Sequence, residues 1–303
     1  MCIRDSIGSG RISWGELTKK GSVAFAQEVS NISKSSFSNM EQNFHEYSGL
    51  IYDGAFSEHI TSKEKRGLTG DNIDEQKAQE IAKKFIGEDK VQEITSTGKS
   101  ENTNMPTFDF SVKVNGETNS NMVISISEKG GHVVFMNYNR DIQAESVTQE
   151  RADEIGKDFL KSRGFDDMKE TYYLKQDGIV TINYAYEQDG VTVYPDLIKL
   201  KVALDNGEIM GIETTGYLNS HEKRNISDVK ITKEQAKKDL NSKIEILSEN
   251  LAIIPTEWKT EVLCWEFKGK VDDTDFLVYI NAKTGEEQDI LVITNTPNGT
   301  LTH

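Results

Sequence analysis

IDEQKA at residues 73–78 decides how this chain is expected to fold, because the same pattern returns as VTQERA at residues 147–152 and ITKEQA at residues 231–236. Each copy begins with an apolar residue and a good helix-capping residue, Asp or Thr, and places an alanine four positions after the cap. An apolar residue before the cap can pack on that alanine. The pattern therefore predicts that a helix begins at each copy.

An alternating apolar segment follows each predicted helix and is interrupted by a glycine, at Gly131, Gly207 and Gly285. The distances from the helix alanines to these glycines are 53, 55 and 49 residues. Glycine supplies the backbone conformation that a tight hairpin requires. The sequence therefore indicates one helix-then-sheet unit used three times. A repeat without a shared reactive residue favours binding over catalysis.

The buried face of each predicted helix can be read from apolar residues at three- and four-residue spacing. Gly87 and Gly164 supply stop signals for the first two helices. We expect helices of about 12 to 15 residues that cover one face of a sheet. The three stripes are Ala78, Ile81, Ala82 and Phe85; Ala152, Ile155 and Phe159; and Ala236, Leu240 and Ile244.

The segments after the helices alternate between apolar and polar residues, as strands of an antiparallel sheet with one solvated face do. The predicted fold class is therefore α+β, with three tandem modules of one helix on a three- or four-stranded antiparallel sheet. The clearest predicted strands are Thr107–Val114, Met122–Ile126, Ile179–Tyr186, Ile198–Leu204, Glu257–Phe267 and Phe276–Ile280.

The chain before the first repeat is expected to be helical. Apolar residues recur at three- and four-residue intervals between Ser22 and Tyr47 without Gly or Pro. Met1–Ser6 resembles a translated sequencing-adapter tail, so we expect the native N-terminus, with any anchor or signal, to be missing. The expected organisation is a helical segment at 1–60, a linker at 61–72, and repeats at 73–142, 146–220 and 230–303.

The composition limits the classes of partner. The formal net charge is −15, with 50 acidic against 35 basic residues in 303, whereas a nucleic-acid binder needs clustered Lys and Arg. The chain has no apolar run of roughly 18 residues and no signal-peptide pattern near its start, so we expect no membrane contact by this fragment. Cys2 and Cys264 belong to no metal or disulfide pattern, and Cys264 is expected in the core.

No motif for catalysis, metal binding or cofactor binding is found. The five histidines, His45, His59, His132, His221 and His303, lack metal-ligand spacing, and His59 and His221 are interpreted as surface residues. No serine-nucleophile motif or phosphate-binding loop occurs in a usable context. The acidic run Asp272–Asp275 is interpreted as a solvated turn between strands. We therefore expect no catalytic residues, no metal and no cofactor.

Tyrosines crowd the second repeat. Tyr184 and Tyr186 are expected in the sheet core. Tyr194-Pro195-Asp196 differs, because proline is disfavoured in a central strand and predicts an exposed loop or edge. Since tyrosine is enriched at interfaces, this tripeptide is a candidate for partner contact.

The repeats resemble tandem PepSY modules, and particular strings resemble the spore germination protein YpeB family from Ser22 to the C-terminus. The resemblance implies an extracytoplasmic protein of endospore-forming Firmicutes, located at the spore cortex or inner spore membrane. It also implies a partner, the cortex-lytic peptidoglycan hydrolase SleB, which the PepSY part holds stable and inactive until a germination protease removes that part. Family members carry an N-terminal membrane or signal segment and a longer helical region that this sequence lacks. The strings are Leu50–Ile60, Tyr194–Ile212, Gly216–Leu218, Tyr279–Asp289 and Asn298–Thr302.

The favoured function is therefore a non-enzymatic partner of a SleB-type hydrolase. One alternative is a PepSY-type protease inhibitor or a chaperone resembling a propeptide. A further alternative, motivated by the many carboxylates, is a carboxylate-dependent glycan hydrolase. The candidate partner-binding residues lie in the family-like loops and are Tyr52, Asp53, Phe56, His59, Tyr194, Pro195 and Asp196.

Overall fold

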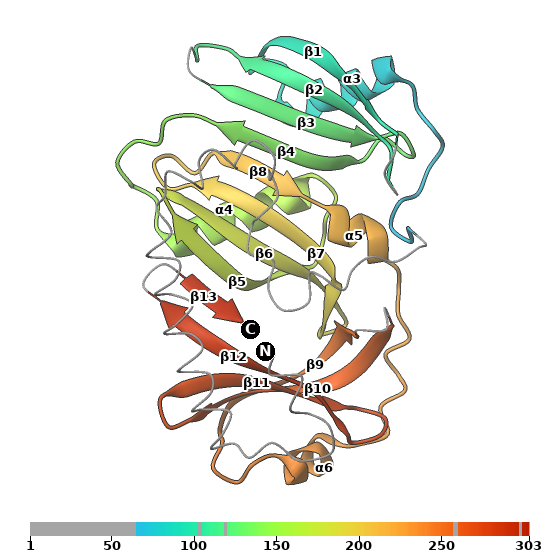
Figure 1. Ribbon diagram of the computed structural model, residues 1–303, viewed down its shortest axis with the longest axis vertical. Coiled ribbons are helices and arrows are strands. Elements are labelled where there is room, and N and C mark those ends of the chain that lie inside the picture. The colour runs from blue at the N-terminus through green and yellow to red at the C-terminus, as the bar shows by residue number, and fades with distance from the viewer. Residues whose placement is uncertain (1–64, 102–104, 118–119, 257–259, 297–298, 303) are drawn as a thin grey trace, which may run out of the picture.

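The computed structural model describes residues 65–101, 105–117, 120–256, 260–296 and 299–302. The expected helical segment at 1–60 and residues 61–64 of the expected linker lie outside these residues. Figure 1 shows three helix-and-sheet units stacked along the long axis. The predicted α+β class with three tandem modules is confirmed. The exact limits given above for the repeats remain predictions.

The first unit consists of one helix and four strands. Helix α3 spans Glu75–Ile86, and its cap residue Asp74 accepts a hydrogen bond from the Lys77 backbone N–H at 2.8 Å. Ala78 and Ala82 are the buried residues of this helix, and both belong to the predicted apolar stripe. The strands are β1 (Val91–Ser100), β2 (Thr107–Val114), β3 (Asn121–Ser127) and β4 (Val133–Asn139).

The second unit has the same order and is followed by a short helix. Helix α4 spans Gln149–Ser162 and is capped by Thr148, whose side chain accepts from the Arg151 N–H. The strands are β5 (Met168–Gln176), β6 (Ile179–Gln188), β7 (Val191–Ala203) and β8 (Ile209–Glu213). Helix α5, at Thr215–Ser220, comes next.

The third unit departs from the prediction in its helix. Thr232 forms a complete capping box with Gln235, but α6 spans only Lys233–Ala236 and continues as the 3-10 turn η3 at Lys237–Asp239. The predicted helix up to Ile244 is therefore wrong. Leu240 and Ile244 nevertheless pack on the same core as Ala236, because a turn followed by an extended segment also brings them to the sheet. The strands are β9 (Glu245–Pro255), β10 (Glu261–Val271), β11 (Thr274–Asn281), β12 (Glu287–Thr296) and β13 (Gly299–Thr302).

The three turn glycines occupy equivalent places. Each has a positive φ, at 68°, 78° and 80° for Gly131, Gly207 and Gly285. A Cβ on Gly131 would lie 2.6 Å from Ile81 Cδ1, and a Cβ on Gly207 would lie 2.6 Å from Ile155 Cδ1. Gly131 and Gly207 are therefore required for two reasons, the backbone conformation and the close approach of the covering helix, whereas at Gly285 the nearest atom would be 3.7 Å away and only the backbone conformation requires glycine. The predicted hairpins are confirmed.

Strands from all three units form one sheet with the order β1-β2-β3-β4-β8-β7-β6-β5-β13-β12-β11-β10-β9. The first and second units join edge to edge, because β4 pairs with β8 from Phe135↔Glu213 to Asn137↔Gly211. The second and third units join twice. Strand β13 pairs with β5 at Gly299↔Leu174, and the start of β7 runs parallel to β9 from Val191↔Leu251 to Val193↔Ile253.

The main core lies between the helices and the sheets of the first two units. Tyr184 is fully buried in it, as predicted, and Tyr186 is half-buried at its border. Cys264 is buried as predicted, and burial raises the pKa of its thiol to about 12. Asp272 and Asp273 form the predicted turn, which joins β10 to β11.

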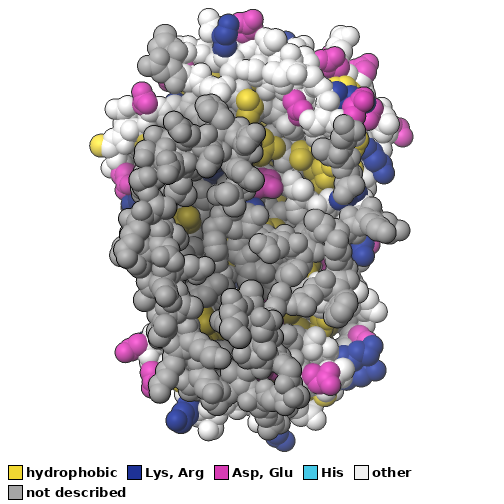
Figure 2. Space-filling model, viewed as in Figure 1, with side chains coloured by type: hydrophobic (Ala, Val, Ile, Leu, Met, Phe, Trp, Pro, Cys, Tyr) yellow, Lys and Arg dark blue, Asp and Glu magenta, His cyan; other side chains and the backbone are white. Residues whose placement is uncertain are grey.

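Acidic and basic side chains of the described residues intermix at the periphery of the face shown in Figure 2. Val123 and Leu247 are large apolar residues that are exposed by 38% and 51%. Among the helices of the described residues, none is long and apolar enough to cross a membrane.

Candidate functional site at the junction of the second and third units

Tyr194-Pro195-Asp196 lies inside β7, where the strand bulges. The β6–β7 register passes from Tyr186↔Val193 directly to Ala185↔Leu197, so the three residues between them have no partner on β6. Before the bulge β7 pairs with β9, and after it β7 pairs with β8. The tripeptide is therefore the point at which β7 passes from its pairing with the third unit to its pairing with β8 inside the second unit.

The expectation that this tripeptide is an exposed loop or edge is wrong. Tyr194, Pro195 and Asp196 are all buried, and Asp196 is 0% exposed. A bulge interrupts the hydrogen-bond ladder, so the N–H that proline lacks is not required there. Contact of these residues with an external partner stays untested, but their observed contacts lie within the chain. Tyr52, Asp53, Phe56 and His59 lie outside the described residues.

Asp196 is the centre of a buried ionic cluster. Its two carboxylate oxygens accept hydrogen bonds from Arg224 Nη1 at 2.5 Å and Nη2 at 2.6 Å. The same guanidinium donates to Glu261 at 3.0 and 3.1 Å, which ties the linker after α5 to β10. Burial lowers the pKa of Arg224, but the hydrogen bonds to Glu261 and Asp196 outweigh it, and the pKa is raised above its ordinary value. Arg224 therefore stays charged and fixes three segments together.

His221 completes this cluster. Its Nδ1 lies 2.7 Å from Asp196 Oδ2. Its ring stacks on Tyr217 at 4.0 Å and meets the edge of Tyr186 at 4.8 Å. The side chain is 27% exposed, so His221 lies partly at the surface, as interpreted, but it also makes contacts that the sequence did not indicate. It is held by a buried acid and two aromatic rings.

The two junctions of the second and third units close a ring of eight strands. The order runs β5-β6-β7-β9-β10-β11-β12-β13 and returns to β5 through Gly299↔Leu174. A cavity of about 250 Å³ lies inside this ring. Its lining comes from every strand of the ring except β6. The site is therefore built by two units together, and neither contains it alone.

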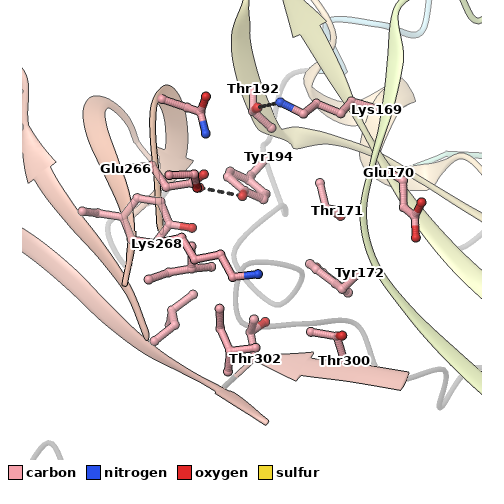
Figure 3. A pocket seen from close by; sticks show the side chains of 16 residues that line it. Lys169, Glu170, Thr171, Tyr172, Thr192, Tyr194, Glu266, Lys268, Thr300 and Thr302 are labelled. Carbon is pink, nitrogen blue, oxygen red and sulfur yellow. Dashed lines mark hydrogen bonds between the residues drawn. The ribbon is translucent and has the colours of Figure 1, made fainter. Parts of the chain in front are cut away.

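Tyr194 of β7 and Glu266 of β10 both line this cavity and contact each other there (Figure 3). The Tyr194 hydroxyl donates to Glu266 Oε2 at 2.6 Å, and both side chains are buried. Tyr194 also meets the ring of Tyr279 edge-on at 6.2 Å. Burial raises the pKa of Glu266, although hydrogen bonds from Tyr194 and Tyr279 oppose the shift. Burial, followed by the charge of Glu266, raises the pKa values of Tyr194 and Tyr279 well above the ordinary range, so both hydroxyls remain donors.

The residues that make this junction were largely missed by sequence reasoning. Glu266 and Arg224 lie 72 and 28 positions from their β7 partners, so no local spacing could pair them. One signal was present: a charged residue in the otherwise apolar segment Val262–Phe267 must be paired or neutralised if that segment is buried. Among the residues that the structure describes, no group of three His, Cys, Asp or Glu side chains is arranged to hold a metal ion.

Comparisons with known proteins agree with this architecture. A family model described as "YpeB sporulation, PepSY1 and PepSY2 domains" matches residues 33–227, and another described as "Peptidase propeptide and YPEB domain" matches residues 230–291. A solved structure, the Bacillus megaterium YpeB C-terminal domain, is similar with a TM-score of 0.67 at 28% identity. The match covers 75% of this chain and 100% of that chain.

Curated relatives share sequence over most of the chain. Sporulation protein YpeB of Bacillus subtilis (strain 168) is 33% identical over 267 residues, which cover 86% of this chain and 58% of the relative. Sporulation protein YpeB of Oceanobacillus iheyensis is 34% identical over 224 residues, which cover 74% of this chain and 49% of the relative. The chain thus spans about half the length of these relatives. Because the first family model matches more than half of its residues, the chain belongs to the YpeB family of sporulation proteins.

Proposed function

We propose that this chain is a non-enzymatic spore protein that binds a cortex-lytic peptidoglycan hydrolase of the SleB type and holds it stable and inactive until germination. Its proposed location is extracytoplasmic, at the spore cortex or inner spore membrane. A germination protease that removes the chain is part of the same proposal. The observation that carries the proposal is membership of the YpeB family across the described repeats.

The structure supports a binding role through the contacts that join its units. Three units share one sheet, and the second and third units are joined by strand pairing, a buried ionic cluster and a buried Tyr–Glu hydrogen bond. A preorganised surface loses little conformational entropy when a partner binds. Holding an enzyme inactive requires a complementary surface and no nucleophile.

The charged groups that the fold brings together at the junction have structural partners. Asp196 and Glu261 are both bound to Arg224, and Glu266 accepts from Tyr194. A carboxylate pair for glycoside hydrolysis would need one acid and one base facing an open sugar site. These contacts favour a binding protein over the carboxylate-dependent glycan hydrolase.

The test is association with the cognate hydrolase. The two proteins are mixed after separate purification and analysed by size-exclusion chromatography with light scattering, and the hydrolase is then exposed to a broad-specificity protease. We expect one complex and a longer hydrolase half-life. An unrelated acidic protein of similar size is the control. Separate elution together with an unchanged half-life would reject the proposal.

The alternative of a protease inhibitor or propeptide-like chaperone has one specific observation behind it. The model that matches residues 230–291 is described as a "Peptidase propeptide and YPEB domain". Inhibition of a secreted metalloprotease by the purified chain, without any effect on the hydrolase, would favour this alternative over the proposed function.

A further inference from the structure

The cavity between the second and third units has a polar half and an apolar half. On its β9–β10 wall, Lys268 pairs with Ser248 and Glu266 pairs with Asn250, so the four side chains share one face. On the neighbouring wall, Leu277 of β11 is opposite Leu291 of β12, and both line the cavity. The lining thus suits a small amphipathic molecule.

The polar half offers the ammonium of Lys268, which forms no ion pair with a carboxylate of the described residues, although its charge acts on the Glu266 carboxyl and lowers the pKa of that group against the larger rise caused by burial. Figure 3 shows Lys268 extending from β10 into the cavity toward Tyr172 and Thr302. No carboxylate of the described residues lies within the 4.0 Å of an ion pair with its Nζ. The other lysine of the lining, Lys169, already pairs with Glu187 at 3.1 Å.

The two carboxyls of the lining are each bound to another group. Glu170 accepts from Gln149 of α4 at 3.0 Å, so its carboxylate belongs to the helix side of β5. Glu266 faces the cavity but is bound to Tyr194, and its burial favours the protonated form. An anion that enters beside Lys268 therefore meets its ammonium together with the hydroxyl of Ser248 and the amide of Asn250, which is the chemistry that recognises a carboxylate.

We propose that this cavity binds a small organic carboxylate. The carboxylate accepts from Lys268, with the hydroxyl of Ser248 and the amide of Asn250 beside it, and the apolar tail lies against Leu277 and Leu291. A volume of about 250 Å³ corresponds to roughly eight waters, which is enough for an acid the size of N-acetylalanine. Either a free acid or the carboxyl terminus of a peptide presents this chemistry.

The test is calorimetric titration of the whole chain with four probes: butyrate, N-acetylalanine, N-acetylalaninamide and inorganic phosphate. We expect saturable binding of the two carboxylates and at least ~10-fold weaker binding of the neutral amide, since a charge-assisted hydrogen bond is lost. Tighter binding of butyrate identifies a free acid as the class, and tighter binding of N-acetylalanine identifies a peptide terminus. Phosphate lacks an apolar part and should bind more weakly than both.

Matched variants locate the site. Lys268→Met should weaken carboxylate binding by ~10-fold or more. Lys270→Met is the control, because Lys270 lies on the same strand outside the lining, with its Nζ 4.0 Å from Asp273, and its loss should change the affinity by less than ~2-fold. The proposal would be overturned by any of three results: no saturable binding by the wild-type chain, equal affinity for the acid and the amide, or equal losses of carboxylate affinity in the two variants. The comparison of acid with amide uses the wild-type chain and holds even if a variant fails to fold.

Discussion

The two junctions of this molecule join equivalent units in different ways. The first extends a sheet: β4 pairs with β8, and Arg140 holds the neighbouring turn through Asp205 and Glu208. The second closes a ring: β7 and β5 of one unit meet β9 and β13 of the next around a cavity. The difference shows that one repeated fold can produce either a longer sheet or a ring of strands around a cavity, depending on which strand edges are paired. Equivalent folds therefore need not have equivalent roles.

The largest expected effect on stability comes from removing the arginine of each junction, Arg224 at the second and Arg140 at the first. Arg224→Met leaves Asp196 buried without its main partner, and we expect a loss of about 3–5 kcal/mol in the free energy of unfolding. Arg140→Met should cost less, because Asp205 keeps the hydrogen bond from the Gln143 N–H at 2.9 Å. Urea denaturation followed by circular dichroism measures both.

The control for these variants is Arg151→Met, which removes an exposed ion pair with Glu154 and should change stability by less than about 0.5 kcal/mol. A smaller loss for Arg224→Met than for Arg140→Met would show that the second junction does not depend on its ionic cluster.

The next effect concerns the seam where β13 meets β5. Gly299 has φ +148°, and a Cβ there would lie 2.3 Å from the Tyr173 carbonyl oxygen. We expect Gly299→Ala to cost about 1–3 kcal/mol and to open the ring. Gly190→Ala is the matched control, since Gly190 also has a positive φ but its Cβ would meet nothing within 4 Å. Equal melting temperatures for the two variants would mean that the close approach at the seam contributes nothing.

Tyr194→Phe removes the hydroxyl that donates a hydrogen bond to Glu266 in the cavity lining. Because Glu266 is then buried with one partner fewer, we expect a loss of about 1–3 kcal/mol. A double-mutant cycle with Glu266→Gln should give a coupling of at least about 0.5 kcal/mol. Strict additivity of the two substitutions would contradict a direct interaction.

The smallest expected effect is a dependence of folding stability on pH, caused by Glu266 of the same pair. The pKa of Glu266 is raised by burial, so between the ordinary carboxyl pKa of 4.5 and the raised value the folded chain holds a proton that the unfolded chain has released. Stability should therefore fall as pH rises through this window and change no further above it. Glu266→Gln removes this contribution, so the variant should gain stability relative to wild type as pH rises from 4 to 8. If the difference in stability between wild type and the variant did not change with pH, the burial of an ionisable Glu266 would be contradicted.

Local patterns predicted the repeated parts of the fold well. Capping residues Asp74, Thr148 and Thr232 act through contacts within a few residues, and each turn glycine has a positive φ that local sequence can signal. Strand β2 has the predicted bounds Thr107–Val114. The third helix failed because Ala236, Leu240 and Ile244 reach the core from a turn as well as from a helix. Strands β1 and β9 were missed because their exposed residues break the alternation on which the prediction rests.

The candidate site could not be predicted in the same way. Pro195 in a central strand contradicts local preference, and only the bulge, which is set by pairing with β6, makes it possible. The Asp196–Arg224–Glu261 contacts join a strand, a linker and the next unit, so they depend on how whole units dock. Tyrosine enrichment pointed to Tyr194 as an exposed partner contact, whereas Tyr194 is buried, and it gave no signal for the buried partner Glu266.

The central claim is that this chain holds a cortex-lytic hydrolase inactive without itself acting on peptidoglycan. The most direct measurement is the rate of cortex digestion by a fixed amount of the cognate hydrolase as the purified chain is titrated in, read as loss of turbidity of purified spore cortex. We predict that digestion falls to background near a one-to-one ratio and that the chain alone digests nothing. An unchanged rate at excess chain, or digestion by the chain alone, would contradict the account.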